Sequence, residues 1–236
     1  HHLIGACVGI LRVKRMPISD IVRMRGRVPT GTPEFDKLVE GGFLPGSLIL
    51  LAGGPGAGKT IFSAKFIYEG ATKYGEPGVY ACFAENKKML ISELQEFGLD
   101  FEPLIKKRHV EILDLSIAME IEVQSALNKI LEAIMYINAK RLVIDSITAL
   151  FAGLKSYLEK RHLIHLLYRL VQKSGCTTIV ITDIPFGVNR IGGSIEEFIA
   201  DGIILMGSYY DNEGLLRRSI RILKMRGTNH ALGTYE

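Results

Sequence analysis

Short apolar runs alternate with longer amphipathic segments along most of this chain. The apolar runs, which are typical of buried strands, lie at residues 48–51, 78–83, 109–113, 141–144 and 177–182. Segments with helical spacing of their apolar positions lie between these runs, at residues 61–74, 87–97, 119–137 and 156–174. Strands that alternate with helices predict parallel βαβ units. We therefore expect an α/β fold with a mostly parallel sheet flanked by helices.

The pattern changes near the C-terminal end of the sequence. An apolar run at residues 202–206 is followed by the turn sequence Asp-Asn-Glu-Gly at 211–214 and by a second run at 218–225. Two runs joined by such a turn predict a β-hairpin. We expect this hairpin to extend the edge of the sheet.

Length and composition indicate one large domain. The chain has 236 residues, of which 47% are hydrophobic, and it lacks the run of roughly 18 apolar residues that a membrane helix needs. Its three cysteines, Cys7, Cys82 and Cys176, have no metal-ligand spacing and are expected to be reduced. We expect a soluble, cytoplasmic protein without membrane insertion.

The positive charge is concentrated at the start of the chain. Residues 1–27 carry six Lys and Arg against Asp20 alone, a balance of +5, so the net charge of +4 leaves residues 28–236 at −1. We therefore divide the chain into a basic extension (1–27), part of it a tag remnant or upstream sequence in one interpretation, and one domain (28–236). A nearly neutral domain makes nucleic acid an unlikely partner.

The clearest motif is GGPGAGKT at residues 53–60, which follows the first strand and precedes the first long helix. It fits the P-loop (Walker A) spacing GxxxxGK(S/T) in the strand–loop–helix context that this motif requires. The residues expected to bind the phosphates of ATP or ADP are Gly53, Gly54, Pro55, Gly56, Ala57, Gly58, Lys59 and Thr60. Glycines let backbone N–H groups approach an anion, the helix N-terminus favours negative charge, and Lys59 adds a full positive charge.

Two acidic residues at strand ends complete the expected chemistry. Asp145 ends the strand of the segment RLVIDS, where it can hold Mg²⁺ together with the Thr60 hydroxyl. Hydrolysis also needs a group that orients the attacking water, and Glu85, after the strand at 78–83, is the candidate. The alternative for Glu85 is a solvated side chain at the start of a helix.

A cluster of cations ends the second strand of the predicted hairpin. In a regular strand, Ile220, Ile222, Lys224 and Arg226 share one face, so two apolar residues lead into two cations on the same side. Such a pair suits an anion. The alternative is a frayed strand end in solvent.

Taken together, these motifs resemble the KaiC-like branch of the RecA superfamily from about Val28 to the end of the chain. The resemblance rests on the segments at 29–42, 53–60, 141–151 and 195–201, and above all on KMRGTNH at 224–230. It implies a RecA-like P-loop NTPase fold and a homo-oligomeric ring, commonly a hexamer, with ATP between subunits. It also implies that Lys224 and Arg226 reach the γ-phosphate of the neighbour's nucleotide and that His230 belongs to the nucleotide site.

The chain departs from the family pattern at three places. Ala84 precedes Glu85 where relatives commonly have paired glutamates, one domain is present where the clock protein has two, and the chain ends at Glu236 where relatives continue into a further strand. Clock and kinase functions are therefore not carried over, and the sequence is expected to lack its end.

We expect a Mg²⁺-dependent regulatory ATPase whose downstream protein partner the sequence does not identify. One alternative is an ATP-binding scaffold with little hydrolysis, which Ala84 favours. The other is a RecA paralogue in DNA repair, which the segment at 184–193 supports only weakly because it carries a single cation, Arg190.

Overall fold

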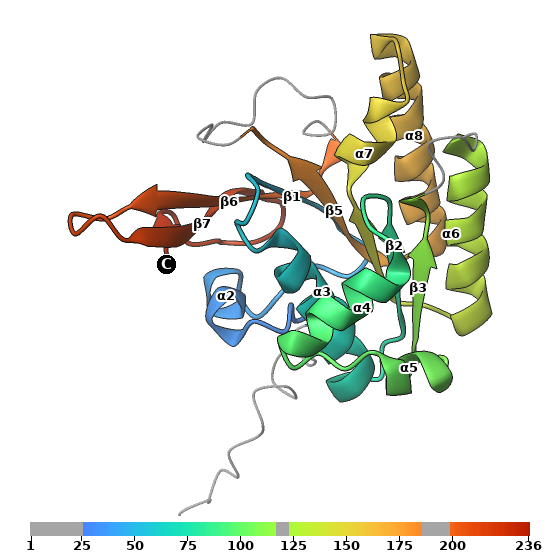
Figure 1. Ribbon diagram of the computed structural model, residues 1–236, viewed down its shortest axis with the longest axis horizontal. Coiled ribbons are helices and arrows are strands. Elements are labelled where there is room, and N and C mark those ends of the chain that lie inside the picture. Colours follow the sequence, from blue (N-terminus) through green and yellow to red (C-terminus); the bar gives the residue numbers. More distant parts are fainter. Residues whose placement is uncertain (1–25, 117–122, 186–198) are drawn as a thin grey trace, which may run out of the picture.

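The computed structural model describes residues 26–116, 123–185 and 199–236, and an 8-stranded sheet forms its centre. The strand order is β3-β2-β4-β5-β1-β6-β7-β8. Neighbouring strands are parallel from β3 through β6, whereas β7 and β8 pair antiparallel. The fold is thus the predicted mostly parallel sheet with a C-terminal hairpin (Figure 1).

The strands follow the apolar runs of the sequence closely. Their bounds are β1 Leu48–Gly53, β2 Gly78–Cys82, β3 Val110–Asp114, β4 Arg141–Asp145, β5 Thr177–Asp183, β6 Gly202–Tyr210, β7 Leu216–Met225 and β8 Thr234–Tyr235. Strand β1 lies between β5 and β6, and every one of its residues is buried. Because both faces of a parallel sheet are covered, a central strand is apolar throughout rather than alternating.

Helices cover the two faces of the sheet. One face packs against α2 (Pro33–Leu38), α3 (Lys59–Lys73), α4 (Lys87–Glu96) and α5 (Glu102–Lys106). The other face packs against α6 (Val123–Ile137), α7 (Ile147–Ala152) and α8 (Tyr157–Ser174). Figure 1 shows the β6–β7 hairpin projecting away from α6 and α8, so that the hairpin forms one end of the molecule.

Several short elements were not predicted, and some predicted features lie outside the described residues. Helices α2, α5 and α7 have six, five and six residues. Such lengths give fewer than two turns over which a helical period can be recognised. Three predicted features lie partly or wholly outside the described residues. They are residues 119–122 of the predicted fourth helix, Cys7 with nearly all of the basic extension, and most of the segment at 184–193, including Arg190.

The predicted face of Lys224 is wrong because β7 contains a bulge. The register pairs Ile222 with Ile204 but Lys224 with Ile203, which leaves Leu223 without a directly opposed residue. A bulge of this kind reverses the alternation of side chains beyond it. Ile220 and Ile222 therefore face the layer of α3, whereas Lys224 lies on the opposite face with Ile203.

Cys82 and Cys176 are free and buried, as expected for reduced thiols. Within the described part of the chain, no helix combines the length and the apolar character needed to cross a membrane.

Candidate functional site

The glycine-rich loop connects the buried end of β1 to the N-terminus of α3, as predicted. Gly58 is the N-cap of this 15-residue helix and has a φ of 96°, and Gly56 has a φ of 72°. Such positive values are left-handed backbone that glycine adopts most easily. The backbone N–H groups at the start of α3 have no partners within the helix, which makes this end an anion-binding position.

Gly53 is required for a reason other than the predicted access to phosphate. It is the last residue of β1 and pairs with Met206 on β6, and a Cβ atom at Gly53 would lie 2.4 Å from the carbonyl oxygen of Met206. A Cβ atom at Gly56 would meet no atom within 4 Å. The first glycine of the motif thus allows two strands to approach closely, whereas Gly56 and Gly58 shape the loop.

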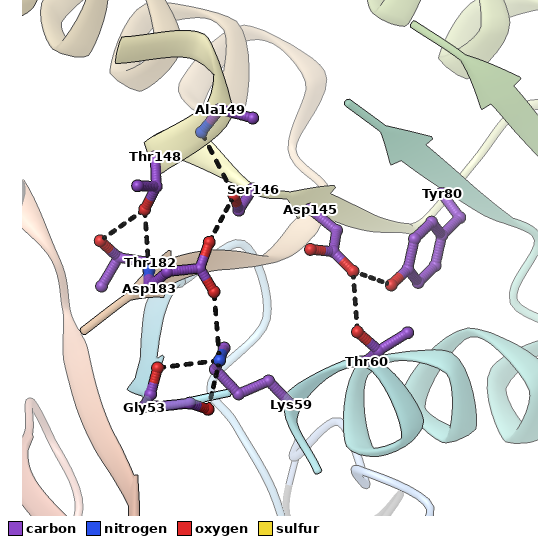
Figure 2. A network of polar contacts seen from close by, with 11 residues as sticks. Gly53, Lys59, Thr60, Tyr80, Asp145, Ser146, Thr148, Ala149, Thr182 and Asp183 are labelled. Carbon is purple, nitrogen blue, oxygen red and sulfur yellow. Dashed lines mark hydrogen bonds and ion pairs between the residues drawn. The ribbon is translucent and has the colours of Figure 1, made fainter. Parts of the chain in front are cut away.

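Lys59 is held by partners at the carboxyl ends of two strands (Figure 2). Its Nζ donates to the carbonyl oxygens of Gly53 at 2.8 Å and Gly54 at 2.9 Å. It also forms an ion pair with Asp183 Oδ1 at 3.1 Å, and the Lys59 side chain is only 8% exposed. A buried ammonium with three oxygen partners is fixed in direction, and it lies where the loop turns into α3.

Thr60 and Asp145 form the expected pair from α3 and β4. The Thr60 hydroxyl donates to Asp145 Oδ2 at 3.2 Å, and Tyr80 Oη donates to the same oxygen at 2.6 Å (Figure 2). Burial raises the pKa of Asp145, while the bonds from Tyr80 and Thr60 act in the opposite direction. Tyr80 in turn has a pKa well above its usual value because it is buried beside this carboxylate.

This pair suits Mg²⁺ by its chemistry. Mg²⁺ prefers hard oxygen ligands and is commonly held by one or two protein oxygens together with phosphates and water. One carboxylate and one hydroxyl lie within hydrogen-bonding distance of each other beside the phosphate-binding loop. Both groups come from rigid elements, the end of β4 and the first turn of α3, so the donor set fits the ion.

Asp183 connects Lys59 to the end of β4. Its Oδ2 accepts a hydrogen bond from Ser146 Oγ at 2.8 Å, and its backbone N–H donates to Thr148 Oγ1 at 2.8 Å. The sequence shows Asp183 only as an acid at the end of β5. The contact with Lys59 becomes visible once β5 and β1 are known to be neighbours.

Glu85 lies in the bend between β2 and α4 and is exposed, as is Ala84. Partial burial raises the pKa of Glu85, and the negative charges of Glu93 and Asp145 raise it further. Glu85 lies three residues beyond Cys82, which pairs with Asp145 on β4, so it lies at the same end of the sheet as the Thr60–Asp145 pair. A carboxylate with a raised pKa is a better proton acceptor.

Lys224 and Arg226 lie beside the amino-terminal end of β1, whereas the loop follows its carboxyl end. The N–H of Arg226 donates to the carbonyl oxygen of Asp201 at 2.8 Å, and the N–H of Asp201 donates to that of Leu48, also at 2.8 Å. Leu48 begins β1, whereas the loop follows Gly53 at its other end. Five residue steps along a strand correspond to about 17 Å. The two cations are therefore remote from the loop of their own subunit.

The environments of the residues at 224–230 differ. Lys224 Nζ donates to the carbonyl oxygen of Ala200 at 2.6 Å, and partial burial, with the nearby charge of Arg226, lowers its pKa. The Arg226 side chain is 60% exposed, with one long contact of 3.4 Å to Asp201 Oδ1. His230 is partly buried, and its Nδ1 lies 3.1 Å from the carbonyl oxygen of Ala231.

A cavity beside the loop was not predicted. It has a volume of about 530 Å³ and lies between α3 and the hairpin. Ala57, Gly58 and Ile61 line it on one side, and Ile220, Tyr235 and Arg218 line it on the other. Arg218 Nε also donates to the carbonyl oxygen of Gly56 at 3.1 Å, which ties the hairpin to the loop. Sequence reasoning missed Arg218 and Tyr235, because the hairpin comes to lie beside the loop only through the pairing of β6 with β1.

Comparisons with known proteins agree with this fold. The family model described as "ATPase: KaiC" matches residues 28–236. UPF0273 protein PH0284 of Pyrococcus horikoshii is 34% identical over 223 residues, which cover 89% of each chain. The solved structure of the KaiC-like protein PH0186 from the same organism has a TM-score of 0.80 and 42% identity, and the match covers 89% of this chain and 93% of that one.

The circadian clock oscillator protein KaiC of Prochlorococcus marinus is also similar. It is 32% identical over 235 residues, which cover 94% of this chain but 45% of that protein. The chain thus spans less than half the length of KaiC.

Proposed function

The chain belongs to the KaiC family of ATPases, and from this premise we propose that it binds and hydrolyses ATP as a ring, with each nucleotide between two subunits. The observation that carries the proposal is the separation between the loop and the cations. The loop follows the carboxyl end of β1, whereas Lys224 and Arg226 lie beside its amino-terminal end. A complete site then needs two copies of the chain.

Within one subunit, the loop and the start of α3 bind the phosphates. Backbone N–H groups of the loop donate to phosphate oxygens, and Lys59, which is already directed along the loop by Gly53 and Gly54, neutralises their charge. Thr60 and Asp145 would hold Mg²⁺. When bound, this ion neutralises charge on the phosphate oxygens.

The adenine base occupies the cavity between α3 and the hairpin. The cavity begins at the loop, and its volume of about 530 Å³ lies within the range of roughly 300–1,000 Å³ that small-molecule sites show. Ile61 and Ile220 offer apolar contacts to the faces of the ring, and Arg218 and Tyr235 offer a flat cation and an aromatic ring.

Hydrolysis uses groups from both subunits. Glu85 accepts a proton from, or orients, the attacking water, since it follows β2 at the end of the sheet that carries Asp145 and its pKa is raised. Arg226 of the neighbouring subunit stabilises the charge that develops on the γ-phosphate, and the exposure of its guanidinium leaves it accessible to a neighbour.

Mixing two inactive variants tests the shared site. Lys59→Ala removes phosphate binding, and Arg226→Ala removes the cation of the neighbour, so each alone should lose nearly all hydrolysis, on the order of 10³-fold for Arg226→Ala. After random mixing in equal amounts, about a quarter of interfaces pair an intact loop with an intact Arg226, and phosphate release should recover accordingly. Arg217→Ala, at the other end of β7, is the control and should retain activity. Absence of recovery in a preparation that has formed mixed rings refutes the shared site.

An ATP-binding scaffold with little turnover is the second candidate, and Ala84 beside Glu85 favours it. Glu85→Gln decides between the two. If Glu85 is the base, the variant binds ATP with unchanged affinity but loses phosphate release by roughly 10²-fold or more. Equal rates in the wild type and in Glu85→Gln, both near background, support the scaffold.

A further inference from the structure

Arg27 binds the backbone turn that directly follows Arg226, although the two residues lie far apart in sequence. Arg27 Nη1 donates to Thr228 Oγ1 at 2.6 Å, and Nη2 donates to the carbonyl oxygen of Gly227 at 3.1 Å. Its side chain is only 9% exposed. The guanidinium thus links the end of the basic extension (1–27) to the segment at 224–230.

Arg27 is itself fixed to the body of the domain. Its Nη2 forms an ion pair with Glu40 at 2.6 Å. The next residue, Val28, exchanges two backbone hydrogen bonds of 2.8 Å with Phe43. Gly42 permits this approach, because a Cβ atom there would lie 2.2 Å from the carbonyl oxygen of Val28. Arg27 therefore holds the turn from a rigid support.

The turn is also held from its upstream side and by the Thr228 hydroxyl, which donates to the carbonyl oxygen of Arg226 at 3.3 Å. Upstream, the N–H of Arg226 bonds to Asp201, whose carboxylate accepts a hydrogen bond from the N–H of Leu48 at 2.9 Å. Gly227 has a φ of 62°, and a Cβ atom there would lie 2.9 Å from Leu44. The backbone of Arg226 is thus held by Asp201, which is bonded to Leu48 of β1, and the turn after it by the Arg27 guanidinium. The side chain of Arg226 extends into solvent.

We propose that Arg27 is a positioning residue for the nucleotide site of the neighbouring subunit, because it fixes the Gly227–Thr228 turn that carries Arg226. The inference rests on the proposed function. Displacement of a transition-state cation by about 1 Å can lower a rate by roughly 10²-fold. Arg27 therefore acts on the neighbour's nucleotide and not on the nucleotide bound to its own loop.

Three variants separate positioning from folding. Arg27→Ala removes the whole link. Thr228→Val preserves the shape of the side chain but removes the hydroxyl, which accepts from Arg27 Nη1 at 2.6 Å and donates to the carbonyl oxygen of Arg226 at 3.3 Å. We expect Arg27→Ala to lower kcat by about 10-fold to 10²-fold with little change in KM, and Thr228→Val to have a smaller effect of the same kind. Arg27→Lys keeps the charge but not the planar set of donors, so its kcat should be intermediate.

Mixed rings show which nucleotide Arg27 serves. Arg27→Ala subunits keep their loop, and Lys59→Ala subunits keep a correctly held Arg226, so the mixture of these two should recover activity. Mixing Arg27→Ala with Arg226→Ala should give no recovery of activity, because both variants are defective in the same half of the site. If Arg27→Ala does not fold, Thr228→Val is used in the same mixtures, with recovery measured relative to its higher starting rate.

The outcomes distinguish the inference from the function on which it rests. If Lys59→Ala and Arg226→Ala recover activity together but Arg27→Ala is rescued by Arg226→Ala instead of Lys59→Ala, Arg27 serves its own loop and the inference is overturned. Unchanged kcat in Arg27→Ala or, where that variant does not fold, in Thr228→Val overturns it as well. Failure of the reference pair overturns the shared site itself and the inference with it.

Discussion

At the scale of single residues, the ion pair between Lys59 and Asp183 sets a competition. The same ammonium that neutralises phosphate lies 3.1 Å from the carboxylate of Asp183, which is 48% exposed. A phosphate that binds at the loop competes with Asp183 for Lys59 and is repelled by the negative charge of Asp183. The affinity for nucleotide therefore depends on Asp183 as well as on the loop.

Asp183→Asn should tighten nucleotide binding. The amide keeps an oxygen that can accept the hydrogen bond of Ser146, but it neither neutralises Lys59 nor repels phosphate. We expect the Kd of ADP, measured by calorimetry, to fall by roughly threefold to tenfold, since partly screened charges a few ångströms apart interact by about 1 kcal/mol. Glu213→Gln, which removes an exposed acid from the hairpin turn, is the control. Weaker binding in Asp183→Asn would show that this carboxylate supports the bound state.

At the scale of elements, strands and long helices could be predicted because their apolar residues repeat over enough positions. Strand β1 is buried along its whole length, and α8 begins at a Ser156–Glu159 capping box that is legible in the sequence. The bulge at Leu223 was not predictable, because one extra residue leaves the apolar pattern of β7 unchanged until the partner strand is known. That residue decides the face on which Lys224 lies.

The candidate site was predictable in part for a related reason. The loop, Thr60 and Asp145 belong to a contiguous motif or to a strand end, and the structure brings them together. Tyr80, Asp183 and Arg218 reach the site from three other strands. Their roles depend on the strand order, which periodicity does not specify.

Two glycines of the loop should respond differently to alanine. Gly53→Ala forces β1 and β6 apart, because its Cβ would lie 2.4 Å from the Met206 carbonyl oxygen, and overpacking of this kind costs about 1–3 kcal/mol or more. Gly56→Ala meets open space and incurs only the strain of its positive φ, about 1 kcal/mol. Urea unfolding without nucleotide should therefore give a lower midpoint for Gly53→Ala. Equal midpoints would contradict the packing role of Gly53.

At the scale of the whole molecule, a buried group of charges joins the N-terminal segment of the domain to its core. Arg141 is fully buried, donates to the carbonyl oxygens of Pro29 and Phe66, and pairs with Glu76 at 2.6 Å. Asp36 accepts a hydrogen bond from the N–H of Thr30 nearby. Burial raises the pKa of Asp36 to about 6, against the effect of Thr30 and of Arg141.

The stability of the fold should therefore depend on the ionisation of Asp36. Because the folded-state pKa is above the unfolded value of 3.8, the stabilising contribution of protonated Asp36 is fully present below about pH 4 and is lost as the pH rises through 6. Asp36→Asn has no carboxyl group to ionise at this position, so it does not lose stability in this way as the pH rises. Its free energy of unfolding relative to wild type should rise by about 2–3 kcal/mol between pH 4 and pH 7. A constant difference across denaturation curves in that range would contradict the raised pKa.

The central claim is that one subunit binds ATP and its neighbour supplies Arg226. The most direct measurement is the structure of the assembled protein with Mg²⁺ and a non-hydrolysable ATP analogue, read as the distance from the Arg226 guanidinium to the nearest γ-phosphate oxygen. We predict a hydrogen bond of about 3 Å to the nucleotide on the neighbour's loop. The nucleotide on the same subunit should lie at least about 17 Å away, across the length of β1. An Arg226 that contacts its own nucleotide, or none at all in an active assembly, would contradict the account.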